Sequence, residues 1–427
     1  MIKYFEIQDF KSYSKAKLKL APLTVLVGAN ASGKSNALEA IRFLSWLAQG
    51  QKLSSLQYKV NQDDYIVRGH IKDLFRNGKE TFSIGCALSD NIETKLQLSF
   101  DFRNGEIHIK HEECTMSTEF LYKTVKPTDG SSTDIAVEYN NFARGGRKPQ
   151  ITCNDQLAIF TQMVSAARFS DGHEKAKRVI PVTASKFEKQ LANILFLDPV
   201  PARMRDYSFI SDKQLTGDGR NLSSVLYQLW NDSDGVKAEL LTFIQSLPEQ
   251  DIKAIDFLQG PRNEVMVQLI ETFGSIERKI DASLLSDGTL RVLAIASALL
   301  SAPEGCMVII EEIDNGIHPS RAKRLLESID SIARKRKLVI LISSHNPALL
   351  DALPVSTIPN VVFCYRDKID GNSKLISLED IPDYPELIAQ GTLGDLVTQG
   401  LLESFVKNYE GTEIKKLKAL EWLKSIQ

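Results

Sequence analysis

The run Gly28–Ser35 has the residue types and spacing of a phosphate-binding loop. It reads Gly-Ala-Asn-Ala-Ser-Gly-Lys-Ser and matches the pattern G-x-x-x-x-G-K-[ST]. Glycines at positions 28 and 33 let the backbone curl until successive N–H groups point at a phosphate chain, whose negative charge the dipole of the following helix favours. Lys34 is then expected to reach the β and γ phosphates, and the Ser35 hydroxyl to bind Mg²⁺. The pattern therefore predicts a nucleotide site rather than a chance glycine-rich turn.

The segments around this loop supply the context that the pattern needs. The apolar run Leu23–Val27 precedes it and the helical stretch Asn36–Leu47 follows it, so we expect a strand, the loop and a helix in that order. The residues expected to bind ATP are Gly28, Ala29, Asn30, Ala31, Ser32, Gly33, Lys34, Ser35 and Asn36.

Two apolar runs further along the chain end in side chains suited to phosphate chemistry. Met307–Glu312 ends in two carboxylates, and Lys337–His345 ends in a histidine. The alternation of a strand predicts that Glu311 faces the Mg²⁺ shell and that Glu312 faces the γ phosphate as a candidate base for water. The imidazole of His345 would hydrogen-bond the γ phosphate, and both runs read as buried parallel strands.

A fourth element, Ser283–Arg291, opens the apolar helix expected over Leu290–Leu300. Ser286 and Gly288 lie where a helix N-terminus offers unpaired N–H groups to an anion, with Asp287 between them. Taken singly, each of these elements also has a purely structural interpretation. Ser283–Arg291 would be a capped turn, the two glutamates a solvated strand end, and His345 a structural residue. The occurrence of all four elements in this order favours a nucleotide site.

The composition is that of an ordinary globular protein. The chain has 427 residues, of which 43% are apolar and 25% charged, and a formal net charge of −2, which argues neither for nor against a nucleic-acid partner. No apolar stretch reaches membrane-spanning length and the start does not resemble a signal peptide, so we expect a cytoplasmic protein with no membrane partner. The five cysteines lack metal or disulfide spacing. The basic run Arg334–Lys337 reads as a solvated helix end rather than a DNA contact.

The remaining patterns predict three parts in the chain. Residues 1–110 are expected to form an N-terminal ATPase lobe, with the P-loop and a β-meander of strands near Tyr65–Ile71, Thr81–Leu88, Lys95–Phe102 and Glu106–Ile109. Residues 111–192 are expected to form a mostly helical inserted subdomain, and residues 193–427 a C-terminal ATPase lobe. The closing stretch Glu413–Ile426 has apolar residues at helical spacing opposite lysines, which favours packing on its own domain over docking a partner.

Together the motifs resemble ABC-type AAA ATPases of the OLD, RecF and SMC group, and most closely the stand-alone OLD-like ATPases of bacterial anti-phage defence. Shorter segments add to the resemblance: Asp9–Tyr13, Asp73–Arg76, Leu197–Pro199 with Arg203 and Arg205, Asp218–Leu222, Glu312–Pro319 and Gly391–Asp395. The resemblance implies an α/β P-loop NTPase fold of ABC/SMC type, with a mixed central sheet, flanking helices, an antiparallel β-layer and the inserted subdomain. It makes Gly28–Ser35 the Walker A loop, Leu285–Thr289 the signature motif, Glu311 and Glu312 the Walker B end, Asp314–His318 the loop at a dimer seam, and His345 the switch histidine.

The resemblance also implies a shared active site, in which the signature motif of one copy covers the ATP of another. The expected protein is a homodimeric clamp, open to further oligomerisation, whose ATP hydrolysis with Mg²⁺ controls assembly with a separately encoded effector, a nuclease or a toxin. A full Toprim nuclease domain needs roughly 100 residues, and only 82 follow His345. The alternative is a RecF-like DNA-binding ATPase of repair. Transporter-type ATPases have an aspartate as the first Walker B carboxylate, and their signature motif ends in Gly-Gly-Gln. This chain has Glu311 and Asp287-Gly288-Thr289 there, which argues against a transporter subunit.

Overall fold

The computed structural model describes residues 1–58, 66–89, 92–126, 132–245, 252–273, 276–315, 319–381, 384–389 and 391–407. Its strands are β1 (Ile2–Phe10), β2 (Tyr13–Lys19), β3 (Leu23–Val27), β4 (Thr81–Ser89), β5 (Glu93–Arg103), β6 (Glu106–Met116), β7 (Glu119–Lys126), β8 (Asp134–Tyr139), β9 (Gln150–Asn154), β10 (Leu195–Leu197), β11 (Ser208–Phe209), β12 (Ile252–Gly260), β13 (Glu264–Phe273), β14 (Ile276–Asp281), β15 (Met307–Ile310), β16 (Val339–Ser344), β17 (Val361–Arg366) and β18 (Ser373–Ser377).

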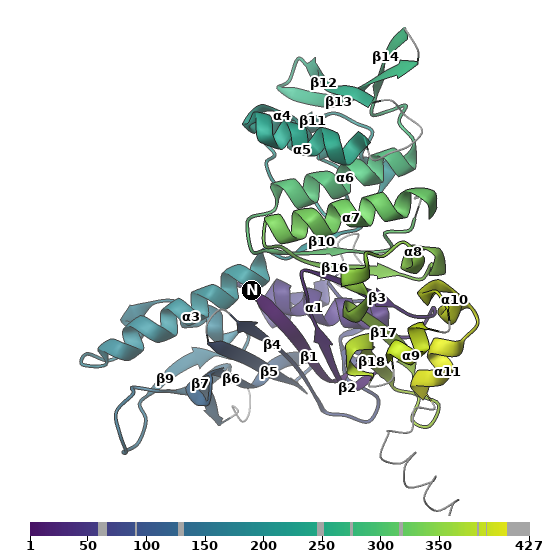
Figure 1. Cartoon of the computed structure of the whole chain (residues 1–427). Coiled ribbons are helices and arrows are strands. Elements are labelled where there is room, and N and C mark those ends of the chain that lie inside the picture. Colours follow the sequence, from purple (N-terminus) through teal and green to yellow (C-terminus); the bar gives the residue numbers. More distant parts are fainter. Residues whose placement is uncertain are drawn as a thin grey trace, which may run out of the picture.

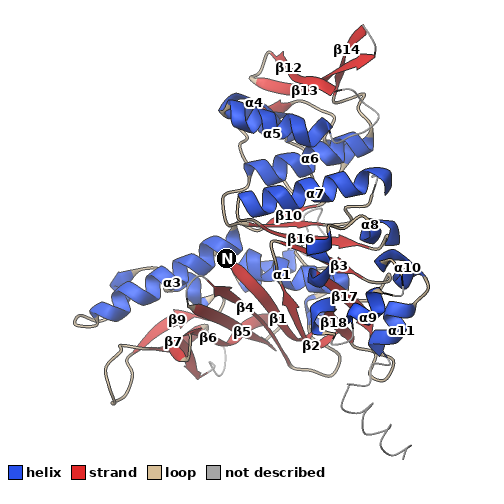
Figure 2. Cartoon of the chain, viewed as in Figure 1, coloured by secondary structure: helices blue, strands red, loops and turns tan. Residues whose placement is uncertain are grey.

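The α-helices are α1 (Lys34–Ala48), α2 (Ile159–Gln162), α3 (Glu174–Ala192), α4 (Leu222–Asp232), α5 (Asp234–Gln245), α6 (Asp287–Ser301), α7 (Pro319–Lys335), α8 (Pro347–Asp351), α9 (Tyr384–Ile388), α10 (Leu393–Thr398) and α11 (Leu401–Lys407). Helices and strands both occur along the length of the chain, and Figure 2 shows the helices beside the strands, so the fold is α/β. No helix in the part of the chain described above combines the length and apolar character needed to cross a membrane.

One large mixed sheet runs through the molecule in the order β10-β15-β16-β3-β17-β18-β2-β1-β4-β5-β6-β7-β8-β9. The strands from β10 to β17 are parallel, whereas those from β2 to β9 are antiparallel. Every residue of β3, β15 and β16 is buried, because helices cover both faces of this half. The parallel half and the antiparallel wing are both visible in Figure 1.

Alternate residues of the parallel strands pack into two separate cores. Val308 and Ile340 face the core that contains α4, α5, α6 and α7. Ile309 and Leu341 face the core that contains α1 and α3. The P-loop helix α1 and the helices α6 and α7 therefore lie on opposite faces of the sheet (Figure 1). A smaller sheet of β11, β13, β12 and β14 lies beyond α4 and α5.

Several sequence predictions agree with these elements. The helix expected over Asn36–Leu47 is α1, the helix expected over Leu290–Leu300 is α6, and the strand expected over Thr81–Leu88 is β4. The strand expected at Tyr65–Ile71 is wrong for its described residues, because residues 66–69 are bends and Ile71–Leu74 is a 3₁₀ helix. The stretch Glu413–Ile426 lies outside the described residues.

Residues 111–192 differ from the mostly helical subdomain that we expected. The antiparallel sheet continues through β7, β8 and β9, and helix appears mainly in the second half of this segment, as α3. The boundary expected after residue 110 falls inside β6. Alternation in these strands is interrupted by register shifts in the β6–β7 and β7–β8 pairs, which weakens the two-residue period that a sequence reading depends on. The three-part division of the chain stays a prediction.

Candidate nucleotide-binding site

The P-loop joins β3 to α1 through two glycines that no other residue replaces without strain. Gly28 and Gly33 have φ values of +155° and +121°. A Cβ atom on Gly28 would lie 2.1 Å from the carbonyl oxygen of Cys364, and one on Gly33 would lie 2.3 Å from Ser373 Oγ. The tight curl of the loop therefore depends both on glycine conformations and on the hairpin of β17 and β18 packed against it.

That hairpin and strand β2 brace the loop from outside. The hydroxyl of Ser373 donates to the carbonyl of Ser32 at 2.6 Å, and Tyr13 Oη donates to the carbonyl of Gly33 at 3.1 Å. Arg366 Nε donates to the carbonyl of Ala31 at 3.2 Å. Three carbonyls of the loop are thus turned outward to the protein, which leaves the opposite side of the peptide units for an anion.

Lys34 lies over the loop at the beginning of α1. Its Nζ donates to the carbonyls of Gly28 at 2.5 Å and Ala29 at 3.1 Å. Burial lowers the pKa of Lys34 from its ordinary value, and the nearby Cys364, Glu312 and Asp314 act in the opposite direction. The first turn of α1, which the structure describes completely, has neither a side-chain cap nor an acidic residue. The positive end of the helix is therefore open to an anionic ligand.

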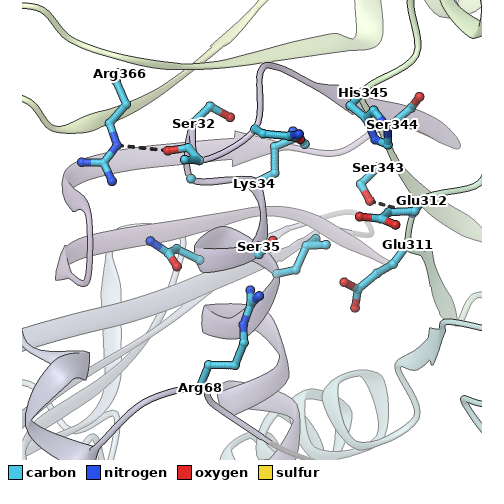
Figure 3. A pocket seen from close by; sticks show the side chains of 15 residues that line it. Ser32, Lys34, Ser35, Arg68, Glu311, Glu312, Ser343, Ser344, His345 and Arg366 are labelled. Atoms are coloured by element: carbon cyan, nitrogen blue, oxygen red, sulfur yellow. Dashed lines mark hydrogen bonds between the residues drawn. The ribbon is translucent and has the colours of Figure 1, made fainter.

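The carboxyl ends of the parallel strands gather the other polar groups beside this loop. Val27 of β3 is in register with Ser344 of β16, and β15 pairs with β16 on its other side. A cavity of about 350 Å³ results at this edge. Its described lining consists of Asn30, Ala31, Ser32, Gly33, Lys34, Ser35, Asn36, Leu38, Arg68, Glu311, Glu312, Ser343, Ser344, His345 and Arg366, shown in Figure 3.

Glu311, which directly follows β15, forms an ion pair with an arginine of the P-loop helix α1. Its Oε1 lies 2.5 Å from Arg42 Nη2. Burial raises the pKa of the Glu311 carboxyl from its ordinary value, the Arg42 guanidinium lowers it, and the nearby Asp198 carboxylate raises it. Arg42 also lies over the ring of Phe196 in β10, 4.7 Å from its centroid. The ion pair thus joins α1 to the end of β15.

Glu312 has a backbone conformation that is unusual for a residue with a side chain, with φ at +47°. Its N–H donates to Ser343 Oγ at 3.1 Å, and its Oε2 accepts a hydrogen bond of 2.6 Å from Asn315 Nδ2. These contacts hold the carboxylate at the edge of the cavity, on the side facing Lys34 and His345 (Figure 3). Strained backbone of this kind concentrates at functional sites.

His345 follows β16 and lies against a buried acid. Its Nδ1 is 3.7 Å from Asp314 Oδ2. The other carboxylate oxygen of Asp314 is buried and has no hydrogen-bond partner among the described residues. The imidazole is half-exposed, and the cavity includes it.

The signature segment occupies a different place. Ser286 caps helix α6, with its Oγ accepting from the N–H of Thr289 at 3.1 Å. Arg205 Nη1 donates to the carbonyls of Ser283 at 2.9 Å and Leu285 at 2.7 Å, and its Nη2 lies 2.6 Å from Asp287 Oδ1. One guanidinium therefore fixes the turn that opens α6.

The structure brings most of the predicted site residues together. Asn30 to Asn36 line one cavity with Glu311, Glu312 and His345, and Gly28 and Ala29 contact it through Lys34. Among the described lining residues, Ser286, Asp287 and Gly288 are missing.

Sequence reasoning missed Arg42, Arg68, Arg366 and the two serines of β16. The serines had a usable signal, since they directly precede His345 at the end of an apolar run. The arginines had none, because they come from separate elements that meet only in the fold.

The groups at the cavity fit Mg²⁺ and a phosphate chain. Ser35 and Glu311 offer the hard oxygen ligands that Mg²⁺ prefers. No group of three or more His, Cys, Asp or Glu side chains suited to a metal occurs within the described ranges. At phosphate sites Mg²⁺ is held by one or two protein ligands together with phosphate oxygens and water.

A strand, a curled glycine loop and a helix, with two carboxylates after β15 and a histidine after β16, define a P-loop ATPase. A family described as "AAA domain, putative AbiEii toxin, Type IV TA system" matches residues 23–351. The chain belongs to this AAA family, and it is an ATPase.

Individual relatives are more distant. An "ATP/GTP phosphatase" of Helicobacter pylori is 22% identical over 370 residues, covering 83% of this chain and 87% of that protein. The DNA replication and repair protein RecF of Leptospira interrogans is 34% identical over 101 residues, which are 23% of this chain and 27% of RecF. The SMC head bound to the C-winged helix domain of ScpA aligns with a TM-score of 0.49 and 16% identity, covering 88% of this chain and 98% of that one.

Proposed function

We propose that the cavity binds ATP with Mg²⁺ and that its side chains divide the work of hydrolysis. Lys34 neutralises the β and γ phosphates, and Ser35 with Glu311 holds the metal. Glu312 orients and deprotonates the attacking water, and His345 hydrogen-bonds the γ phosphate. Mg²⁺ supplies charge neutralisation at the phosphate oxygens. The gathering of these groups at one sheet edge supports the assignment.

We further propose that two copies of the chain share each ATP. The observation that carries this proposal is the separation of the signature turn from the described pocket lining. Ser286 and Asp287 are exposed, and Leu284 beside them is 74% exposed, which leaves this turn available to a second molecule. A signature turn contributed by the partner copy would bring N–H groups of a helix N-terminus to the phosphates.

The ATP-bound dimer would then act on another protein. We propose an OLD-like role, in which the ATP-bound dimer restrains or releases an effector, a nuclease or toxin, in a cytoplasmic defence complex. The family description, which mentions a Type IV toxin–antitoxin system, is compatible with a defence role of this kind but names no separate effector. A RecF-like role in DNA repair is the second candidate, supported by the RecF proteins that match part of this chain.

The shared site is tested by size-exclusion chromatography with light scattering, with and without ATP. Wild type and Glu312→Gln should be monomeric without nucleotide, and Glu312→Gln should become a stable dimer with ATP because hydrolysis no longer opens it. Lys34→Ala should stay monomeric. A Glu312→Gln protein that binds ATP and remains a monomer would contradict the model. Purification from the native operon, followed by mass spectrometry, distinguishes an effector from repair proteins.

A further inference from the structure

One part of the antiparallel wing, residues 141–193 with β9 and α3, carries an excess of basic side chains that the nucleotide site does not use. Residues 141–193, all described, contain nine Lys and Arg against four Asp and Glu, whereas the whole chain has a formal net charge of −2. Positive charge is therefore concentrated in one part of the wing. Figure 1 shows this part, α3 and the β8–β9 connection, on the side of the molecule away from α10 and α11.

Three of the four acidic side chains in this segment already lie beside other cations of the protein. Asp155 is fully buried and pairs with Arg103 at 2.8 Å and with His108 at 3.1 Å. Lys177 lies 2.7 Å from Asp171 and 3.7 Å from Glu174. The carboxylates therefore do little to neutralise the other cations on this surface.

The connection between β8 and β9 presents two arginines at a glycine turn. Arg144 and Arg147 are exposed on either side of Gly145 and Gly146, whose φ values are +70° and +75°. A Cβ atom on either glycine would meet no atom within 4 Å, so the turn projects into open space. Among the described residues, neither arginine has an ion-pair partner.

The base of this turn is fixed to the beginning of α3. Lys148 Nζ donates to the side-chain oxygens of Asn140 and Asn141, at 3.1 and 3.2 Å. Lys175 Nζ lies 4.3 Å from the centroid of the Phe142 ring. The base of the arginine turn therefore lies beside the beginning of α3.

Helix α3 continues the basic surface along its solvent-facing ridge. Buried residues such as Ile180 and Phe187 hold one face of the helix in the core that contains α1, and Lys175, Arg178 and Lys189 are exposed on the other side of the helix. From residue 175 to residue 189 the ridge is about 21 Å long. The same length of DNA duplex carries roughly a dozen phosphate charges.

We propose that this surface, defined by Arg144, Arg147, Lys175, Arg178 and Lys189, binds the phosphate backbone of a DNA duplex. Exposed cations without carboxylate partners bind phosphates and release counterions, whereas cations already in ion pairs gain little from doing so. The glycine turn would place two guanidiniums at a groove, while the helix ridge follows the backbone. The contacts are to phosphates, so binding should depend strongly on salt and weakly on sequence.

The basic run Arg334–Lys337 provides a control for the substitutions on the wing. Arg334, Lys335 and Lys337 are exposed, but each pairs with a carboxylate, Asp330, Glu239 and Glu304 respectively. Three neutralising substitutions there remove as much formal charge as three on the wing, without removing an unpaired cation. The run therefore controls for net charge.

The test measures fluorescence anisotropy of a labelled 30-base-pair duplex of random sequence, without nucleotide, from 50 to 200 mM KCl. Wild type should bind with a steep salt dependence. The variant Arg144→Gln/Arg147→Gln/Arg178→Gln should bind about tenfold or more weakly at 50 mM, with the slope of log K against log salt reduced by roughly two to three, because each phosphate contact contributes about 0.9. The variant Arg334→Gln/Lys335→Gln/Lys337→Gln should bind like wild type.

Three results would overturn the proposal: no duplex binding by wild type at 50 mM KCl, undiminished binding by the wing variant, or an equal loss in both variants. Circular dichroism and basal ATPase should be the same for all three proteins, since none of the substituted residues lines the cavity. The proposal does not rest on the shared ATP site, and Lys34→Ala should still bind the duplex. Loss of nucleotide-driven dimerisation with intact duplex binding would contradict only the shared ATP site of the proposed function.

Discussion

Arg42 of the P-loop helix and Glu311 at the end of β15 form an ion pair, with 2.5 Å between Nη2 and Oε1. Both side chains are about one-fifth exposed. The pair links the element that would hold the phosphates to the carboxylate that we assign to the metal. The position of α1 and the charge of Glu311 are thereby coupled.

Replacing Arg42 should therefore weaken both the fold and the reaction. In Arg42→Ala the Glu311 carboxylate loses its counter-charge in a largely buried position, which should cost roughly 2 kcal/mol of unfolding free energy. We expect kcat for ATP to fall about tenfold or more, because the carboxylate loses its orientation. Urea unfolding and steady-state ATPase assays measure the two effects. Arg42→Lys keeps the charge and should recover part of both; full activity in Arg42→Ala would contradict the coupling.

Gly33→Ala should abolish nucleotide binding with a modest loss of stability. The new Cβ atom would lie 2.3 Å from Ser373 Oγ at a φ of +121°, so the loop must move away from the β17–β18 hairpin. A fluorescent ATP analogue measures the affinity. Gly50→Ala, at a φ of +74° in open space, is the control and should cost only about 1 kcal/mol while leaving the affinity unchanged. Equal affinities in the two variants would show that the close packing of Gly33 does not matter.

Arg205→Ala should slow ATP hydrolysis even though Arg205 is not among the described residues lining the cavity. Its guanidinium holds two carbonyls and Asp287 at the turn that begins α6, so its loss should disorder the surface proposed to cover the partner's ATP. We expect weaker ATP-induced dimerisation and a loss of cooperativity in ATP concentration, with unchanged binding of ATP to the monomer. Arg203→Ala is the neighbouring control, because Arg203 pairs with Asp218 instead. A similar defect in both variants would contradict a specific role for Arg205.

A buried acid in the wing should make stability depend on pH. Glu112 of β6 is completely buried, and its carboxylate accepts from the N–H groups of Ile159 and Phe160 and from Tyr122 Oη. Burial raises its pKa from 4.5 to about 7, while the three hydrogen bonds act in the opposite direction. Between pH 4.5 and about pH 7, Glu112 is protonated in the folded protein and ionised in the unfolded chain. Its stabilising contribution is therefore complete below pH 4.5 and is lost as the pH rises toward 7, by on the order of 3 kcal/mol.

Urea unfolding of wild type and Glu112→Gln at pH 5 and pH 8 measures this contribution. The substitution removes the titrating group, so the variant should lose less stability than wild type between the two values. An identical change in both proteins would show that other groups carry the pH dependence.

The sequence predicted those parts of the site that lie within continuous motifs. Gly28 to Ser35, the end of β15 and His345 were found because each has a local pattern and each ends a strand whose neighbours are fixed by parallel pairing. Arg42, Arg68 and Arg366 were not, because their roles follow from the packing of α1, of the segment after residue 65 and of β17 around one cavity. The helical content of residues 111–192 was overestimated where β-bulges break the strand period.

The bracing of the P-loop has a consequence for synthesis of the chain. The loop is complete by residue 35, yet its backbone is held by Ser373 and Arg366, which leave the ribosome more than 300 residues later. A nascent chain that has folded its first strands and α1 therefore lacks the support that keeps Gly33 in place. Nucleotide binding should therefore begin only when β17 and β18 have been inserted into the sheet.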